Sequence, residues 1–588
     1  MCNRTKMLKR LAKCVREYKL PTILTLIFIV AEAVIEVLIP FITASLINHI
    51  KAGANMPDIV KTGVLLAVMA IISLCCGGIA ARTCAKAAAG FSKNLRHDIF
   101  RKIQTYSFSN IDKFSSSSLV TRLTTDVANV QMSFMMLIRT AIRSPLLLIF
   151  SVFMAYYMGG AMATVFVVVI PLLGGGLLFI GRKAMPAFRA VFRKYDRLNE
   201  SIEENVRAMR VVKGFSREEY EKEKFGTEAE KIRADFTKAE RIVAFNTPLM
   251  QLCMYLNMVF ILLMGSYLAV TTRGVDIDVG QISAMLNYGM QILMSLMMLS
   301  MIYVMLTMSA ESAKRIFEVL NEESALQNPA DPIMEVADGS VDFENVNFKY
   351  SKEAKRESLA NVDLHIRSGM TVGIIGGTGS GKSSLVQLIP RLYDVTEGSV
   401  KVGGRDVREY DLDTLRGSVA MVLQKNLLFS GTIKENLRWG NANATDEEIR
   451  EACRLAQADE FVTSFPDGYD TKIEQGGTNV SGGQKQRLCI ARALLKKPKI
   501  LILDDSTSAV DTKTDALIRS GFKSYIPETT KIIIAQRISS VQDADMIIVM
   551  NNGAVENVGT HSQLLESSEI YREVYEQQTN GGEQHGNE

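Results

Sequence analysis

Long apolar runs recur between residues 21 and 308, whereas beyond about residue 335 short apolar runs alternate with polar stretches, as in a soluble domain. A helix that spans a bilayer needs about 20 consecutive, mostly apolar residues. Six runs qualify, at 21–47, 60–83, 144–158, 161–181, 243–270 and 281–308. The third is short, but residues 132–142 continue its pattern, so its helix is expected to begin well before Ser144. The pattern therefore predicts an α-helical membrane domain followed by a soluble domain.

The overall composition agrees with this division. Hydrophobic residues make up 47% and charged residues 22% of the 588 residues, and the mean hydropathy is +0.11. These values exclude a disordered chain, a collagen and a small disulfide scaffold. The net charge of +4 gives no reason to expect nucleic-acid binding. The eight cysteines include no CxxC pair, which indicates small buried side chains in a reducing compartment or in the membrane.

The amino-terminal residues 1–20 are basic and carry apolar side chains at helical spacing, at Met7, Leu8, Leu11 and Val15. This pattern predicts an amphipathic helix on an anionic membrane surface. Six spans place both termini on one side of the membrane. The basic amino terminus and the basic stretch 182–241 assign that side to the cytoplasm of a cell-membrane protein.

Two long polar stretches separate the spans. About 60 residues lie between the second and third runs, and about 60 between the fourth and fifth. Both stretches are predicted to continue the membrane helices into the cytoplasm, with breaks near 107–118 and 211–216. They are either solvated charged helices or rigid levers whose tips, near 110–114 and 212–215, touch another domain close to Gln424. Their equal lengths and matched positions favour levers.

Several polar or flexible side chains lie within the predicted spans. Glu32 and Glu36 share one helix face, as do Arg139 and Arg143, because each pair is four residues apart. Such charges either pair with one another, line a hydrated cavity or contact a charged substrate. The sixth run is rich in methionine, which suits a cavity for apolar ligands but equally suits packing or lipid contact. Its methionines are Met285, Met290, Met294, Met297, Met298, Met301, Met305 and Met308.

Residues 376–383 match the phosphate-binding pattern GxxxxGK[ST] completely. A buried strand is predicted at 371–375, and Ser384 opens a predicted helix. Glycines let successive backbone N–H groups point inward around an anion, and the helix dipole adds to this attraction. The candidate phosphate-binding residues are Gly376, Gly377, Thr378, Gly379, Ser380, Gly381, Lys382, Ser383 and Ser384. Lys382 is expected to reach the β- and γ-phosphates of a nucleotide, and Ser383 to bind Mg²⁺.

A second buried strand is predicted at 500–504, and it ends in the carboxylate of Asp504. Such an aspartate can hold Mg²⁺ through water, opposite Ser383. Between the two strands, residues 480–487 read VSGGQKQR. A serine and two glycines at the start of a helix form a second anion site. Its candidate residues are Ser481, Gly482, Gly483 and Gln484.

This last segment resembles the signature of ATP-binding-cassette proteins, and other features of that family follow in order. Tyr350 stands where an aromatic residue stacks on adenine, and Gln424 where a glutamine senses Mg²⁺ and meets the membrane domain. Residues 508–511, including Asp511, resemble the loop that crosses to the other cassette. The six spans and two long excursions resemble the exporter-type membrane domain. The chain is similar to a half-transporter of the multidrug-exporter-like group.

The resemblance implies an α/β P-loop nucleotide-binding domain that takes ATP and Mg²⁺. It also implies a dimer in which each ATP lies between the phosphate loop of one chain and the signature Ser-Gly-Gly of the other. The implied domains are an amphipathic amino-terminal helix (1–20), an exporter-type transmembrane domain (21–320), a linker (321–338), a nucleotide-binding domain (339–575) and a polar tail (576–588).

Two positions depart from the family pattern. After the Mg²⁺ aspartate the family usually has a glutamate that polarises the attacking water, and here the residue is Asp505. Its carboxylate is one methylene shorter and lies about 1.5 Å further back. The family's switch histidine is replaced by Gln536. These two changes predict a degenerate site that binds ATP well and hydrolyses it poorly.

A chain with an intact signature and a defective catalytic half-site is suited to a heterodimer, in which the partner is a different chain and not a second copy of this one. The expected partner is a second half-transporter that supplies the glutamate and the histidine, while this chain supplies Ser481 to the partner's ATP. The expected function is ATP-driven export of a drug-like or lipid-like substrate from the cytoplasm or inner leaflet. The alternatives are a low-turnover regulatory subunit and a lipid flippase. Six spans argue against a soluble cassette ATPase, and the long excursions argue against an importer.

Overall fold

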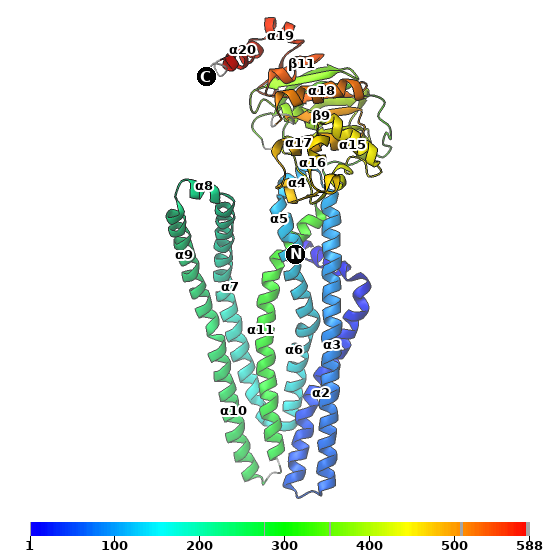
Figure 1. Ribbon diagram of the computed structural model, residues 1–588. Helices are drawn as coiled ribbons and strands as arrows, with labels where there is room; N and C mark the ends of the chain where they lie inside the picture. Colours follow the sequence, from blue (N-terminus) through cyan, green and yellow to red (C-terminus); the bar gives the residue numbers. More distant parts are fainter. Residues whose placement is uncertain (1, 274, 276, 352–353, 506–509, 584–588) are drawn as a thin grey trace. The chain divides into compact units, whose positions relative to one another are not determined.

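The computed structural model describes residues 2–273, 275, 277–351, 354–505 and 510–583, and it forms two compact units (Figure 1). The first unit consists of Met1–Gln104 and Ser115–Glu322. The second consists of Glu323–Glu588 together with the short segment Thr105–Phe114, which lies far away in the sequence. The second unit therefore includes a piece of the first predicted excursion.

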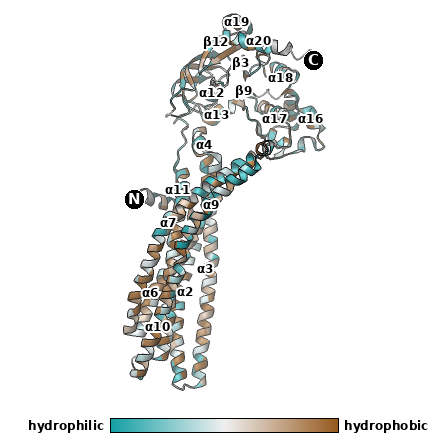
Figure 2. Cartoon of the chain, turned by 90° about the vertical axis from the view of Figure 1, so that its left-hand side faces the viewer, coloured by the Kyte–Doolittle hydropathy of each residue, from teal (hydrophilic) through white to brown (hydrophobic). Residues whose placement is uncertain are grey.

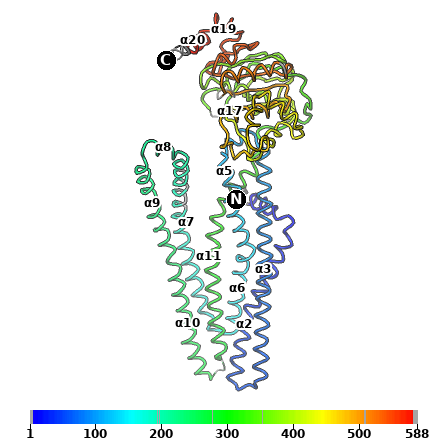
Figure 3. Tube along the Cα trace, in the orientation of Figure 1, coloured from blue at the N-terminus to red at the C-terminus, as the bar shows by residue number. Residues whose placement is uncertain are grey.

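Long helices make up the first unit (Figure 3). Within the described residues they are α2 (Lys19–Lys51), α3 (Met56–Gln104), α6 (Val127–Gly159), α7 (Thr164–Arg207), α9 (Glu218–Ala244), α10 (Asn246–Thr271) and α11 (Val279–Asn321). Hydrophobic colouring predominates along α6 and α10, and α9 is strongly hydrophilic (Figure 2). The third membrane helix begins at Val127, well before Ser144, as the pattern predicted.

Five helical segments of the described residues are long and apolar enough to cross a membrane, whereas the sequence pattern predicted six spans. The difference lies in Ser116–Phe188, which counts as one segment of 73 residues. A straight helix of that length would measure about 110 Å, far more than a bilayer core. The segment contains the whole of α6, a short 3-10 helix at Gly160–Ala163 and the start of α7, with Gly160 at φ +47°. It therefore carries both the third and the fourth predicted spans.

The predicted breaks in the two excursions are confirmed. The first contains two short helices, α4 (Phe108–Phe114) and α5 (Ser116–Thr121), between α3 and α6. The second contains α8 (Met209–Gly214) between α7 and α9. Ion pairs three residues apart, such as Lys231–Glu228 and Arg233–Glu230, follow the solvated surface of α9.

The amino terminus differs from the expected single surface helix. The helix α1 (Cys2–Ala12) is followed by a 3-10 helix, Lys13–Tyr18, with a break at Arg16. Met7 and Leu11 are buried within the protein, because the segment packs on α3 and α11. The Arg16 guanidinium donates to both carboxylate oxygens of Asp98 on α3, each at 2.8 Å. This apolar face is therefore covered by the protein's own helices, and of the predicted apolar residues Leu8 is exposed.

The second unit contains two larger sheets. One has the strand order β12-β11-β3-β10-β9-β6, and the neighbours from β11 to β6 pair in parallel. Its strands are β3 (Thr371–Gly376), β6 (Val419–Val422), β9 (Ile500–Asp504), β10 (Thr530–Ile534), β11 (Met546–Asn551) and β12 (Ala554–Gly559). The other is antiparallel, with the order β2-β1-β4-β5. Its strands are β1 (Val341–Phe348), β2 (Leu359–Ile366), β4 (Glu397–Val402) and β5 (Arg405–Asp406).

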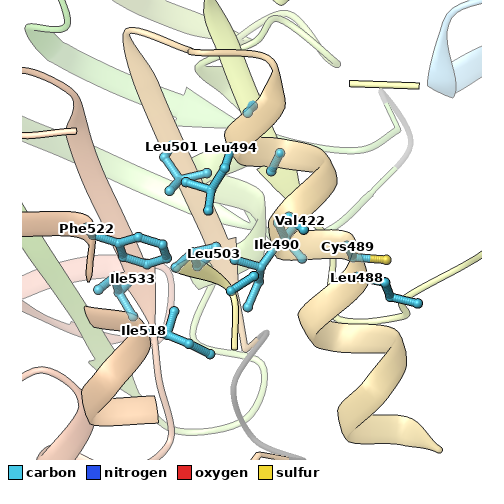
Figure 4. Packing of buried hydrophobic residues seen from close by; sticks show 14 of the residues in the cluster. Val422, Leu488, Cys489, Ile490, Leu494, Leu501, Leu503, Ile518, Phe522 and Ile533 are labelled. Atoms are coloured by element: carbon cyan, nitrogen blue, oxygen red, sulfur yellow. The ribbon is translucent and has the colours of Figure 1, made fainter. Parts of the chain in front are cut away.

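Helices cover the larger sheet, and buried hydrophobic side chains from the helices and the strands pack together between them (Figure 4). From α17 (Gly482–Leu495), Ile490 packs beside Leu503 and Leu494 packs beside Leu501, both on β9. Phe522 of α18 (Thr512–Tyr525) packs beside Ile533 of β10. The remaining helices of this unit are α12 (Lys382–Leu388), α13 (Leu412–Ser418), α14 (Ile433–Leu437), α15 (Asp446–Leu455), α16 (Asp459–Ser464), α19 (His561–Ser567) and α20 (Glu569–Glu583). A short hairpin pairs β7 (Gly431–Thr432) with β8 (Lys472–Ile473).

Both flanks of the predicted nucleotide-binding domain are structured. Residues 323–338 belong to the second unit, where the Ile333 N–H donates to the Glu409 carbonyl at 2.9 Å and Val336 is buried. At the other end, α20 runs on to Glu583, into the predicted polar tail.

Candidate functional site

The parallel strands β3, β10, β9 and β6 lie side by side, so their carboxyl ends meet at one edge of the sheet. The phosphate-binding pattern follows β3, Asp505 follows β9, Gln536 lies two residues after β10, and Gln424 lies two residues after β6. Ligands of open α/β sheets bind beyond this edge. The fold therefore gathers candidate residues that are far apart in the sequence.

The loop between β3 and α12 requires glycine at particular positions. A Cβ on Gly376 would lie 2.2 Å from the Met550 carbonyl oxygen, and one on Gly381 would lie 2.7 Å from the Ser358 carbonyl oxygen. Gly381 also has φ +95°, a conformation that disfavours other residues. The loop is thus pressed against neighbouring backbone, which leaves its N–H groups to form the inner surface of an anion cradle.

Lys382 folds back over this loop. Its ammonium group donates to the Gly376 and Gly377 carbonyl oxygens, each at 2.8 Å. Burial lowers the pKa of Lys382, and the nearby carboxylates of Asp504 and Asp505 act in the opposite direction. The cation is therefore already held at the loop where a phosphate chain would bind.

Ser383 and Asp504 form the candidate magnesium position. The Ser383 hydroxyl donates to Asp504 Oδ1 at 3.1 Å, and Asp504 is buried. Burial, and then the neighbouring charge of Asp505, raises the pKa of Asp504. Hydroxyl and carboxylate oxygens are the ligands that Mg²⁺ prefers, and a divalent cation would offset the buried negative charge. The residues present therefore fit Mg²⁺ bound together with a nucleotide.

Asp505 is the meeting point of two amide side chains. Gln536 Nε2 donates to Asp505 Oδ2 at 2.7 Å, and Gln424 Nε2 approaches the same oxygen at 3.3 Å. Asp505 is only 8% exposed and has φ +49°, with its backbone N–H bound to the Ile534 carbonyl. The sequence indicated each of these residues separately, but it gave no sign that both glutamines converge on one carboxylate oxygen.

The signature segment forms the amino-terminal cap of α17. Gln484 N–H donates to the Ser481 hydroxyl at 3.3 Å, and Ser481 N–H donates to Gln484 Oε1 at 2.9 Å. This reciprocal capping box fixes the start of the helix. Ser481 and Gly482 are exposed, so this helix start is accessible to another molecule.

Asp511 caps α18 by accepting a hydrogen bond from the Thr514 N–H at 2.9 Å. The preceding residues of the predicted crossing loop, Ser508 and Ala509, lie outside the described part of the chain. The described part of this loop is therefore its last two residues, 510 and 511, next to the start of α18.

Tyr350 belongs to a small aromatic group beside α12. Its hydroxyl shares a hydrogen bond of 2.9 Å with the Ser384 hydroxyl and donates to Gln387 Oε1 at 3.2 Å. Its ring makes edge contacts with Phe348 and Tyr393, with centroids 4.8 and 5.1 Å away. Burial raises the pKa of Tyr350, which is nevertheless 45% exposed. One part of this ring therefore remains accessible for stacking.

The first excursion tip docks on this aromatic group. The Tyr393 hydroxyl donates to Asp112 Oδ2 of α4 at 2.8 Å, and the rings of Phe108 and Tyr393 lie 6.0 Å apart. Asn110 Nδ2 donates to the Glu323 carbonyl at 3.0 Å. The predicted contact between this tip and a cassette is confirmed, but the contact lies beside Tyr350 instead of the predicted place close to Gln424. Sequence reasoning missed Tyr393, which belongs to no motif.

The second tip, around α8, exposes apolar side chains. Val211 is 57% and Phe215 is 76% exposed. Its docking on a cassette stays a prediction.

Three charged residues of the membrane helices, Arg143, Glu32 and Glu36, pair with one another. Arg143 of α6 donates to Glu36 Oε2 at 2.6 Å and lies 3.6 Å from Glu32 Oε1, both on α2. This geometry favours pairing over substrate contact for these three residues, while Arg139 is exposed. In α11, Met285 is fully buried and most other methionines of the predicted cluster are exposed.

Comparisons with known proteins agree with this geometry. Residues 22–297 match the model of the ABC transporter transmembrane region, and residues 359–508 match that of the ABC transporter. The chain is 36% identical to the uncharacterized ABC transporter ATP-binding protein YfiB of Bacillus subtilis, over 96% of this chain and 97% of the relative. It is 34% identical to YknU of the same organism, described in the same words, over 82% of each.

A solved structure of a bacterial Atm1-family ABC exporter with ATP bound has the same fold, with a TM-score of 0.82. Its sequence is 23% identical to this chain, and the likeness covers 96% of this chain and 98% of that one. The predicted helical membrane domain followed by an α/β nucleotide-binding domain is thereby confirmed. The chain belongs to the ABC transporter family and has its exporter-type fold, with a transmembrane region followed by an ATP-binding cassette.

Proposed function

We propose that this ATP-driven transporter is one subunit of a heterodimeric exporter, and that its own ATP site binds nucleotide but hydrolyses it poorly. The observation that carries the proposal is the amide contact at Asp505, where Gln536 Nε2 donates at 2.7 Å. A general base must reach the attacking water and accept its proton. Asp505 is shorter than the usual glutamate, and one of its oxygens already accepts hydrogen bonds from amides.

Gln536 adds a second chemical deficiency. An amide donates and accepts hydrogen bonds, but unlike an imidazole it does not exchange a proton near neutral pH. Gln536 can therefore contact a γ-phosphate without assisting proton movement. The loss falls on the chemical step, where general acid–base catalysis typically contributes about 10²–10⁴-fold.

The groups assigned to nucleotide binding support near-normal affinity. Lys382 lies at the phosphate loop, Ser383 and Asp504 lie 3.1 Å apart, and part of the Tyr350 ring is accessible. Bound Mg²⁺ would neutralise charge on the β- and γ-phosphates. ATP is accordingly expected to stay bound at this site over several transport cycles and to hold the cassettes partly together.

The exposed Ser481 and Gly482 support a role in the partner's site. A helix start with free backbone N–H groups attracts phosphate oxygens. Relatives YfiB and YknU, each described as an ABC transporter ATP-binding protein, both come from Bacillus subtilis, so one organism can encode more than one chain of this family. Both termini and the cassette are proposed to lie in the cytoplasm. The substrate is proposed to be drug-like or lipid-like, since the exposed methionines of α11 offer adaptable apolar surface.

Heterodimerisation predicts that the purified chain alone releases phosphate slowly, because each of its sites contains Asp505 and Gln536. Co-purification with its partner half-transporter should raise the ATPase rate by at least about tenfold. Lys382→Ala in the lone chain serves as the background control. If the lone chain and the pair hydrolyse ATP at equal rates, the degenerate-site proposal fails.

The contact of α4 with Tyr393 predicts a second result. We expect a cross-link made with a short bifunctional methanethiosulfonate reagent between cysteines introduced at Phe108 and Tyr393, whose rings lie 6.0 Å apart, to reduce ATPase activity of the pair severalfold by blocking movement at the tip. Reduction with dithiothreitol should restore it. The single-cysteine variants, treated identically, control for loss of the side chains. Full activity of the cross-linked pair would show that this contact does not need to move.

A further inference from the structure

The helix α20 is anchored to the core of the second unit at its start. Tyr571 is fully buried, and its hydroxyl lies 2.7 Å from His561 Nδ1 of α19. Val574 and Tyr575 are partly buried against the same core. The next turn of the helix is therefore held at a defined place.

Gln578 lies on that next turn and contacts the segment that carries Gln536. Its Nε2 donates to the Gln536 carbonyl at 2.8 Å, and its Oε1 accepts from the Ile538 N–H at 2.9 Å. One amide side chain thus bridges two backbone groups two residues apart. Among side chains only the amides of glutamine and asparagine pair a carbonyl acceptor with an N–H₂ donor in this way, and asparagine is one methylene shorter.

This bridge adds to the other hydrogen bonds that hold residues 535–538, the segment that carries Gln536. On its amino-terminal side, the Ala535 N–H donates to the Ile374 carbonyl of β3 at 3.2 Å. On its carboxyl-terminal side, Gln578 holds residues 536–538, and the Gln536 side chain reaches Asp505 at 2.7 Å. A continuous series of hydrogen bonds therefore connects the carboxyl-terminal helix to the candidate ATP site.

We propose that Gln578 is a positioning residue of this ATP site, which holds the backbone of residues 536–538 so that the Gln536 amide faces Asp505 and the γ-phosphate position. The inference rests on the proposed function, because it assigns Gln536 to nucleotide retention. It makes α20 part of the machinery that keeps ATP bound, although α20 itself carries no nucleotide-binding motif.

The test measures release of a fluorescent ATP analogue with Mg²⁺ from the full-length chain purified without its partner, in which every site contains Gln536. Loss of two neutral hydrogen bonds predicts that Gln578→Ala releases the analogue about three- to tenfold faster. Gln577→Ala is the matched control, since Gln577 Nε2 donates to Glu573 Oε1 of the same helix at 3.3 Å. That variant should release the analogue at the wild-type rate.

A double-mutant cycle separates positioning from a general structural role. If Gln578 acts through Gln536, then Gln578→Ala should change the release rate less than twofold in a Gln536→Ala background. Gln578→Glu provides a second variant, which keeps the acceptor for the Ile538 N–H but loses the donor to the Gln536 carbonyl. It should release the analogue faster than wild type at neutral pH.

The proposal is overturned if Gln578→Ala and Gln577→Ala release the analogue equally fast, or if the full effect of Gln578→Ala persists without the Gln536 side chain. These outcomes do not depend on hydrolysis. Failure of the degenerate-site proposal would instead appear as rapid phosphate release by the wild-type chain.

Discussion

Replacing Asp505 with Glu and Gln536 with His together is expected to raise the ATPase rate of the chain purified alone by about 10²-fold. The longer carboxylate would reach about 1.5 Å further toward the attacking water. The imidazole would remove the amide that now donates to Asp505 Oδ2 at 2.7 Å. Both changes act on the chemical step, so the affinity for ATP should change little.

The single variants show how the two positions share this effect. Asp505→Glu alone leaves Gln536 to engage the new carboxylate, and Gln536→His alone leaves the base too short, so each should recover only part of the rate. Adding Lys382→Ala to the double variant should return phosphate release to background, because Lys382 lies at the phosphate loop. A double variant that binds ATP but stays as slow as wild type would place the defect elsewhere.

The sequence predicted those features that depend on local chemistry. The phosphate-binding pattern has glycine where a side chain would collide with the carbonyl oxygens of Met550 and Ser358. The whole pattern lies within eight consecutive residues, so it can be recognised from the sequence alone. The excursion breaks were likewise visible, because local composition changes there. The resemblance to the family supplied the remaining candidate positions along the chain.

Contacts between residues that are far apart in the sequence could not be predicted from the local sequence pattern. Gln424, Asp505 and Gln536 meet only because β6, β9 and β10 are neighbours in the sheet. Asp112 and Tyr393 are 281 residues apart, and no motif joins them. The amphipathic pattern at 1–20 showed that an apolar face exists, but a lipid surface and the protein's own α3 and α11 satisfy such a face equally well.

In the intact pair, Ser481→Ala is expected to lower the ATPase rate at least about tenfold, whereas Asp505→Ala should lower it less than about twofold. Ser481 is proposed to complete the partner's hydrolysing site, and Asp505 belongs to the site that turns over slowly. Removal of the partner's catalytic glutamate should nearly abolish activity. The three variants are best compared in one phosphate-release assay on the purified pair.

Ser481 also caps α17, so its replacement removes a helix cap, which typically costs about 1 kcal/mol of stability. Thr445→Ala is the matched control, because Thr445 caps α15 through the same kind of capping box with Glu448. It should shift the melting temperature similarly but leave the ATPase rate near wild type. If Asp505→Ala proves as damaging as loss of the partner's glutamate, Asp505 is a working base. The two sites would then share hydrolysis, and the contact with Gln536 would have to open when ATP binds.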